Sequence, residues 1–138
     1  AANPAFLPDL ASSLNNLGNR YRNLEQREEA LPPTEEAMTI LRELAAANTA
    51  FQPDLATSCG ALGQVLLGLE RAEEASRAFA EGIKVLMPVL PSAPEALMPL
   101  LNALCQDYVT SMESIGQELD QELLAPYFSH LEEGKANE

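Results

Sequence analysis

The sequence repeats itself at a spacing of 45 residues. The segment 3–13, Asn-Pro-Ala-Phe-Leu-Pro-Asp-Leu-Ala-Ser-Ser, returns as 48–58, Asn-Thr-Ala-Phe-Gln-Pro-Asp-Leu-Ala-Thr-Ser. The similarity continues beyond these segments, because 17 of the 45 positions in 3–47 are identical in 48–92. A repeat of this length predicts a stacked array, in which each unit buries its apolar face against its neighbours. Such an array usually presents a surface for binding.

Each unit is expected to form two helices. In the first unit, apolar residues recur at spacings of three and four from Leu10 to Leu24, and Pro8 suits the start of a helix. In the second helix of this unit, Pro32 and Pro33 predict a kink or a delayed start, because a proline deep in a helix removes backbone hydrogen bonds. The helices expected in the two units cover 8–23, 27–47, 53–67 and 72–87.

The rest of the chain is expected to be a degenerate third unit that ends in a cap. Leu101, Leu104 and Tyr108 repeat the three-and-four spacing of the first unit. Helices are expected over 94–114 and 117–133, the second of them bent at Pro126 and ended by Gly134. No strand pattern is found. The sequence therefore predicts one all-α domain over 1–138, with repeats over about 3–47 and 48–92, a degenerate repeat and cap over about 93–133, and a polar tail over 134–138.

Large and small residues alternate at fixed places in both units. The first unit supplies Leu14, Leu17, Gly18, Tyr21, Ala30 and Ala37, and the second supplies Leu62, Gly63, Leu66, Ala75, Phe79 and Gly82. These residues resemble the signature of the tetratricopeptide repeat. Cys59, Thr34 and Arg42 depart from the family's pattern, and the period exceeds the family's usual 34 residues. The chain is similar to the long-helix subclass found in kinesin light chains and in bacterial multidomain signalling proteins. The resemblance implies a right-handed helix-turn-helix solenoid of about six helices.

The resemblance also implies a concave groove lined by the first helix of each unit. The groove positions carried over from the family are Ser12, Asn15, Asn16, Asn19, Arg22 and Asn23 in the first unit, Thr57, Gly60, Ala61, Gln64 and Leu67 in the second, and Asn102, Gln106 and Val109 in the third. An asparagine amide both donates and accepts hydrogen bonds, so it can hold a peptide backbone without reading its side chains. The alternative is that these asparagines form a solvated helix face.

Two features of the predicted groove restrict the kinds of ligand that it could bind. Gly60 and Ala61 leave the second unit nearly bare, which predicts either a shallow pocket or close helix packing. The chain's two lysines, Lys84 and Lys135, fall outside the predicted groove. A lysine clamp for a C-terminal carboxylate is therefore disfavoured.

The charge and the titratable residues exclude several function classes. The formal net charge of −13 repels nucleic acid and anionic membrane surfaces and favours a basic or neutral partner. Cys59, Cys105 and His130 form no metal-type or catalytic pattern, so no metal, no cofactor and no enzymatic activity are expected. Because the two cysteines lie in apolar helical contexts, we expect buried thiols and a cytoplasmic protein.

The sequence thus predicts a module that binds a peptide or helix of a partner protein in its groove. Two alternatives remain: a scaffold or self-association segment of a larger array, and a repeat that senses a small molecule. The first residues match the connection between units, which favours further repeats upstream.

Overall fold

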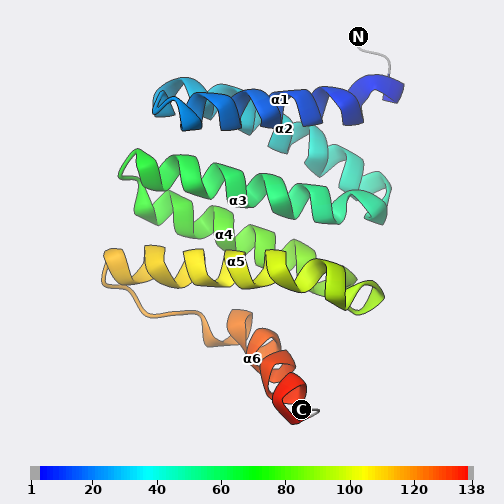
Figure 1. Cartoon of the computed structure of the whole chain (residues 1–138), viewed down its shortest axis with the longest axis vertical. Coiled ribbons are helices and arrows are strands. Elements are labelled where there is room, and N and C mark those ends of the chain that lie inside the picture. The colour runs from blue at the N-terminus through cyan, green and yellow to red at the C-terminus, as the bar shows by residue number, and fades with distance from the viewer. Residues whose placement is uncertain (1–3, 137–138) are drawn as a thin grey trace.

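A computed structural model describes residues 4–136, which fold into six α-helices and no strands within that range. The helices are α1 (Leu7–Asn23), α2 (Arg27–Ala47), α3 (Gln52–Gly68), α4 (Ala72–Leu86), α5 (Pro94–Ser114) and α6 (Gln121–Ala136). Short 3-10 turns cover Pro4–Phe6, Thr49–Phe51 and Met87–Ser92. Figure 1 shows the helices stacked in chain order along the long axis. None of the described helices is long and apolar enough to cross a membrane.

The stack consists of antiparallel helix pairs, as the repeat predicts. We call α1 with α2 the first pair and α3 with α4 the second pair; α5 packs on α4, and α6 follows at the C-terminal end (Figure 1). The all-α helical repeat predicted from the sequence is confirmed, and the first five helices begin and end within one residue of their expected positions. The helix α2 begins at Arg27 and runs through Pro32 and Pro33, so the delayed start considered for it is wrong.

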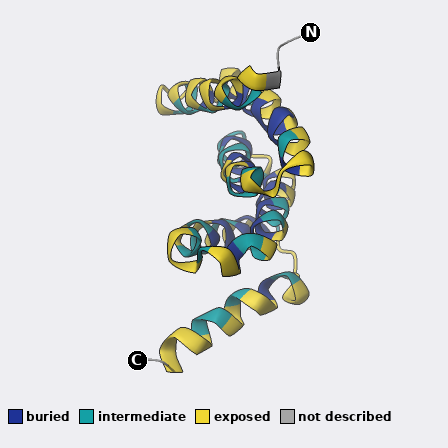
Figure 2. Cartoon of the chain, turned by 90° about the vertical axis from the view of Figure 1, so that its right-hand side faces the viewer, coloured by how far each residue is buried: buried dark blue, intermediate teal, exposed yellow. Residues whose placement is uncertain are grey.

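The last helix differs from its expected bounds at both ends. It begins at Gln121 rather than at 117, because the Asp120 carboxylate accepts hydrogen bonds from the backbone N–H groups of Glu122 and Leu123 at 3.1 and 3.2 Å. Such a side chain caps a helix N-terminus. At the other end α6 continues through Gly134 to Ala136, so this glycine does not end the helix. Most of α6 is exposed (Figure 2), and Leu124 is its one buried residue within the described range.

Glycines allow the two helices of each pair to approach closely. A Cβ atom added at Gly18 would collide with Thr34 Oγ1, and one added at Gly63 would collide with the ring of Phe79. Thr34 stands where the second unit has the aromatic Phe79. Its hydroxyl is buried and donates to the carbonyl oxygen of Ala30 at 2.8 Å. The departure from the family pattern at Thr34 is thus accommodated by an internal hydrogen bond.

The first and second pairs meet through an apolar contact between α2 and α3. Leu55 and Cys59 of α3 share one buried cluster with Met38 and Leu41 of α2. Leu55 retains 6% of its surface exposed and Cys59 none. This cluster is the hydrophobic part of what we call the pair interface.

Two polar contacts also cross the pair interface. The buried Ser58 hydroxyl donates to Asn15 Oδ1 at 3.1 Å. The Arg42 guanidinium donates to both carboxylate oxygens of Glu81, through Nε at 3.1 Å and Nη2 at 2.8 Å. Because both contacts join residues of different pairs, they fix the register of the second pair on the first.

The first helix of each unit ends in a left-handed residue. Glu25 (φ 59°), Glu70 (φ 61°) and Gly116 (φ 65°) follow the ends of α1, α3 and α5. The next residue in each case donates back across the helix end, as Arg71 N does to Leu66 O at 2.9 Å. This is a Schellman arrangement, in which glycine is the favoured residue because other side chains are strained at positive φ. The third unit has that glycine and the first two have glutamate.

We expect Glu70→Gly to raise the free energy of unfolding relative to Glu70→Ala by about 1 kcal/mol. Both variants remove the same exposed carboxylate, but only glycine relieves the steric strain at φ 61°. Urea denaturation followed by circular dichroism measures the difference. Equal stability of the two variants would contradict a strained backbone at this position.

Candidate functional site

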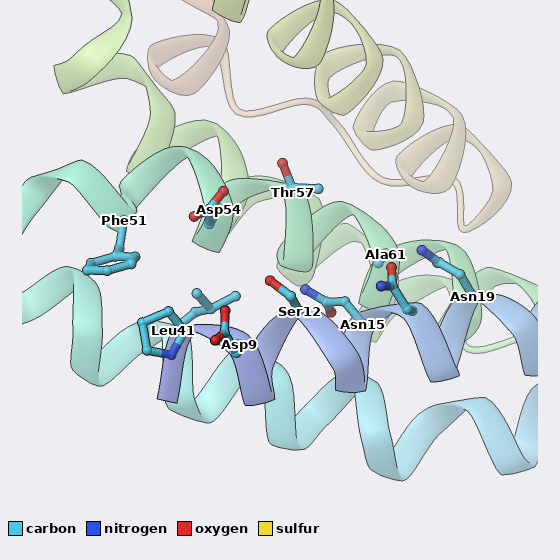
Figure 3. A pocket seen from close by; sticks show the side chains of 11 residues that line it. Asp9, Ser12, Asn15, Asn19, Leu41, Phe51, Asp54, Thr57 and Ala61 are labelled. Atoms are coloured by element: carbon cyan, nitrogen blue, oxygen red, sulfur yellow. The ribbon is translucent and has the colours of Figure 1, made fainter. Parts of the chain in front are cut away.

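A cleft of about 300 Å³ lies between α1 and α3. Figure 3 shows Asp9, Ser12, Asn15 and Asn19 along α1, across from Asp54, Thr57 and Ala61 along α3. We call it the amide cleft. Its lining residues are Pro8, Asp9, Ser12, Asn15, Asn16, Asn19, Leu41, Phe51, Asp54, Thr57 and Ala61. Six of the groove positions predicted from the sequence line it: Ser12, Asn15, Asn16, Asn19, Thr57 and Ala61.

The periodicity of α1 places its polar residues in this cleft. Small Ala11 and Gly18 are buried, and the side chains at 12, 15, 16 and 19 follow one another at helical spacing. Asn15 is half-buried, and its Oδ1 is occupied by the Ser58 hydroxyl. Among the residues that the structure describes, the Asn16 and Asn19 amides have no hydrogen-bond partner. They can therefore both donate to and accept from a ligand.

Two carboxylates that were not among the predicted groove positions also line the amide cleft. Asp9 and Asp54 occupy the first turns of α1 and α3 and are both exposed. They stand at equivalent positions of the repeat, 45 residues apart, and this equivalence was the signal that could have found them. Among residues 4–136, no cationic side chain lines the cleft. The cleft thus has a negative field at the end where its two helices begin.

The aromatic ring at one end of the cleft was also missed. Phe51 closes the connection between α2 and α3 and is half-buried, with Leu41 of α2 beside it in the lining. Together they give the polar cleft an apolar end (Figure 3). Finding Phe51 from sequence required knowing how the turn 49–51 folds back towards α1.

Two other predicted groove residues of the second unit, Gly60 and Gln64, make contacts within the stack. Gln64 Nε2 donates to the Asp107 carboxylate on α5 at 2.6 Å. A Cβ atom added at Gly60 would lie 3.3 Å from Leu104 Cδ2, so the structure places Gly60 in close packing against α5. The groove surface is therefore occupied by the chain itself between α3 and α5.

The remaining predicted positions lie outside the amide cleft. Arg22 and Asn23 sit at the C-terminal end of α1. Gln106 borders a separate cavity of about 400 Å³ between α5 and α6, whose lining includes Leu124 and Tyr127. Asn102 Oδ1 is buried on α5 and has no hydrogen-bond partner among the described residues.

The two cysteine thiols of the stack are buried, and burial raises the pKa of each. Burial raises the pKa of the Cys105 thiol to about 12. Burial, followed by the nearby Glu81 carboxylate, also raises the pKa of Cys59. Both thiols are free, buried and protonated at neutral pH, which suppresses nucleophilic chemistry. Within residues 4–136, no group of three or more acidic, histidine or cysteine side chains is placed to hold a metal ion.

Comparison with known proteins finds a family match for one segment of the chain. The family model described as the tetratricopeptide repeat matches residues 10–48, which cover most of α1 and all of α2. No curated protein and no solved structure matches the chain.

Proposed function

We propose that this chain, in which residues 10–48 form a tetratricopeptide repeat, binds an extended peptide segment of a partner protein in the amide cleft. Tetratricopeptide repeats are protein-interaction and scaffold modules, which sets the class of function. The observation that carries the finer proposal is the pair of unpaired amides, Asn16 and Asn19, that face a cleft with an apolar end at Phe51.

The dimensions of the cleft suit a short stretch of extended chain. Asp9 and Asn19 are ten residues apart on α1, which corresponds to about 15 Å along the helix axis. An extended peptide advances about 3.3 Å per residue, so roughly four or five residues fit alongside. Amides that donate and accept match the alternating N–H and C=O groups of such a backbone.

The charge of the cleft favours a basic or neutral peptide. Asp9 and Asp54 line it without a cation, and the chain as a whole carries a formal charge of −13. A lysine or arginine side chain near the start of α1 would gain from this field, whereas an acidic peptide or a nucleic acid would be repelled. The proposal concerns binding and includes no reaction.

The location that we propose is the cytoplasm. Cys59 and Cys105 are both free and buried in the stack. Unpaired cysteines are usual where thiols are kept reduced, and this supports a reducing compartment.

The test is the double substitution Asn16→Ala and Asn19→Ala. Binders are first selected with the unmodified chain from a displayed library of random octapeptides, and their affinities are measured by fluorescence anisotropy. We expect the variant to bind these peptides about 5- to 150-fold more weakly, because two net hydrogen bonds are worth about 1–3 kcal/mol together. The selected peptides should also be enriched in lysine and arginine.

The matched control is Asn23→Ala, which removes an amide from the same helix outside the cleft. This variant should bind as the unmodified chain does. Circular dichroism should show the same helicity for all three proteins. Full retention of affinity in the Asn16/Asn19 variant would contradict the proposal.

A further inference from the structure

The glycine that lets two paired helices approach closely is replaced in the third unit. Cys105 stands at the repeat position of Gly18 and Gly63, where an added Cβ atom would collide with the second helix of the pair. The helix that follows α5 is α6, which is joined to it by the non-helical segment 115–120 and does not pack along α5 as α4 packs along α3 (Figure 1). The third unit therefore lacks the close helix pairing of the first two.

The register of α6 also differs from that of α4. The side chain that fills the space beside Gly63 is Phe79, which stands 16 residues further along the chain and is fully buried. The residue at the same separation from Cys105 is Gln121, which is the first residue of α6 and is exposed. Gln121 therefore does not fill the space that Phe79 fills in the second pair.

A cavity of about 400 Å³ lies between α5 and α6; we call it the α5–α6 cavity. Its apolar lining consists of Cys105 and Val109 from α5 and of Leu124, Tyr127 and Phe128 from α6. The volume lies within the range of small-molecule sites, about 300–1,000 Å³, and exceeds the roughly 150 Å³ that holds a benzene ring. The space left by the loose pairing is thus large enough for a ligand.

The α5–α6 cavity is uncharged. Among the residues that the structure describes, its polar lining consists of Gln106 and Thr110, both exposed at the rim. Burial raises the pKa of the Cys105 thiol to about 12, and burial also raises the pKa of Tyr127, so both groups are neutral at pH 7. An ionised ligand would lose hydration in this cavity without gaining an opposite charge. The lining therefore favours an uncharged ligand.

We propose that the α5–α6 cavity binds a small uncharged molecule with an aromatic or aliphatic body and one polar end. The body would contact Val109, Leu124 and Phe128, and the polar end would form a hydrogen bond with Gln106 or Thr110 at the rim. This site goes beyond peptide binding, because it lies between different helices from the amide cleft and selects for different chemistry.

A ligand that contacts both helices should also hold α6 on the stack. Leu124 is the one buried residue of α6 within the described range, so the docking of this helix has little other support. A ligand that binds only the docked state slows exchange through undocking by the factor 1 + [L]/Kd. At a ligand concentration of about ten times Kd, the α6 amides should therefore exchange about tenfold more slowly.

The test uses two dyes that share one ring skeleton and fluoresce more strongly in apolar surroundings. N-phenyl-1-naphthylamine is uncharged, whereas 8-anilino-1-naphthalenesulfonate carries a negative charge. We expect the uncharged dye to saturate one site on the chain and to slow the exchange of the α6 amides, read by mass spectrometry. The sulfonate should bind roughly tenfold or more weakly, because neither the cavity nor the acidic chain offers it a favourable charge.

The decisive variant is Val109→Trp, which fills the cavity from a half-buried position on α5. It should weaken binding of the uncharged dye about tenfold or more, because the indole occupies the apolar space that the dye would bury. The matched control is Ala103→Trp, which adds the same ring at an exposed position of α5 outside the cavity and should leave the affinity unchanged. Circular dichroism should show equal helicity in all three proteins.

Three results would overturn the proposal. They are full affinity for the uncharged dye in a folded Val109→Trp variant, equal affinity of the unmodified chain for the two dyes, and unchanged α6 exchange at saturation with the uncharged dye. If Val109→Trp loses helicity, the exchange measurement on the unmodified chain decides. Displacement of the dye by the octapeptides selected for the amide cleft would overturn the proposal in favour of a site for a peptide side chain.

Discussion

Phe79→Ala should lower the free energy of unfolding by about 3–5 kcal/mol, the usual cost of emptying a phenylalanine site in a core. Phe79 is fully buried in α4, in the larger of the two apolar clusters, and its ring fills the space left by Gly63 on α3. Chemical denaturation followed by circular dichroism measures the loss. Because this ring joins the helices of the second pair, the loss should affect the whole pair.

The contact with Gly63 makes this prediction specific. Gly63→Ala alone should cost about 1–3 kcal/mol, because the added methyl group would collide with the Phe79 ring. In the Phe79→Ala background that collision disappears, and alanine then gains up to about 1 kcal/mol of helix propensity over glycine. The sign of the Gly63→Ala effect should therefore reverse. The control is Gly134→Ala, where an added Cβ atom meets open space and should cost nothing in either background.

Leu124→Ala should release α6 from the stack while the first five helices remain folded. Leu124 is the one buried residue of α6 within the described range, and removing a buried leucine side chain costs about 2–5 kcal/mol. The other α6 side chains that pack on the same cluster, Leu123 and Tyr127, are only partly buried, so we expect them not to hold the helix once Leu124 is lost. Hydrogen exchange read by mass spectrometry should show α6 amides exchanging at nearly the unprotected rate.

The helices α3 and α4 provide the internal reference in the same experiment. Their amides should keep their protection, because the cluster around Phe79 remains filled. Phe128→Ala, on the same helix and 46% exposed, should leave α6 protected. Loss of protection across α3–α5 in the Leu124 variant would show that α6 belongs to the cooperative core.

The starts of the helices with strong local signals were predicted correctly from the sequence, whereas the start of α6 was placed four residues too early, at 117 rather than at Gln121. Pro8 and Pro53 precede periodic apolar runs, so the starts of α1 and α3 could be placed to within one residue. For α6 the apolar spacing extends back to Leu119, which suggested an earlier start. Instead, the Asp120 side chain caps the helix and α6 begins at the next residue. An aspartate is a favoured N-cap residue, so Asp120 was the signal in the sequence for this later start.

The candidate site was predictable as a set of positions but not as a set of contacts. Asn15, Asn16 and Asn19 are alike in the sequence, and only the structure shows that Asn15 is bonded to Ser58. Gly60 allowed either a pocket or close packing, and the choice depends on Leu104, a residue of another unit. The residues that contact Asn15 and Gly60 lie about one repeat away in the sequence, so a local sequence pattern does not reveal these contacts.

The bonds between units have a consequence for how the chain assembles. Arg42 and Glu81 are 39 residues apart, and the bonds Asn15–Ser58 and Gln64–Asp107 each span 43 residues. Each span is close to one repeat, whichever units are joined. The chain entropy lost in closing such a loop depends on the length of the loop and not on that of the whole protein. Lengthening the stack therefore adds loops of the same size, and the entropic barrier to forming each new joint stays constant as the protein grows.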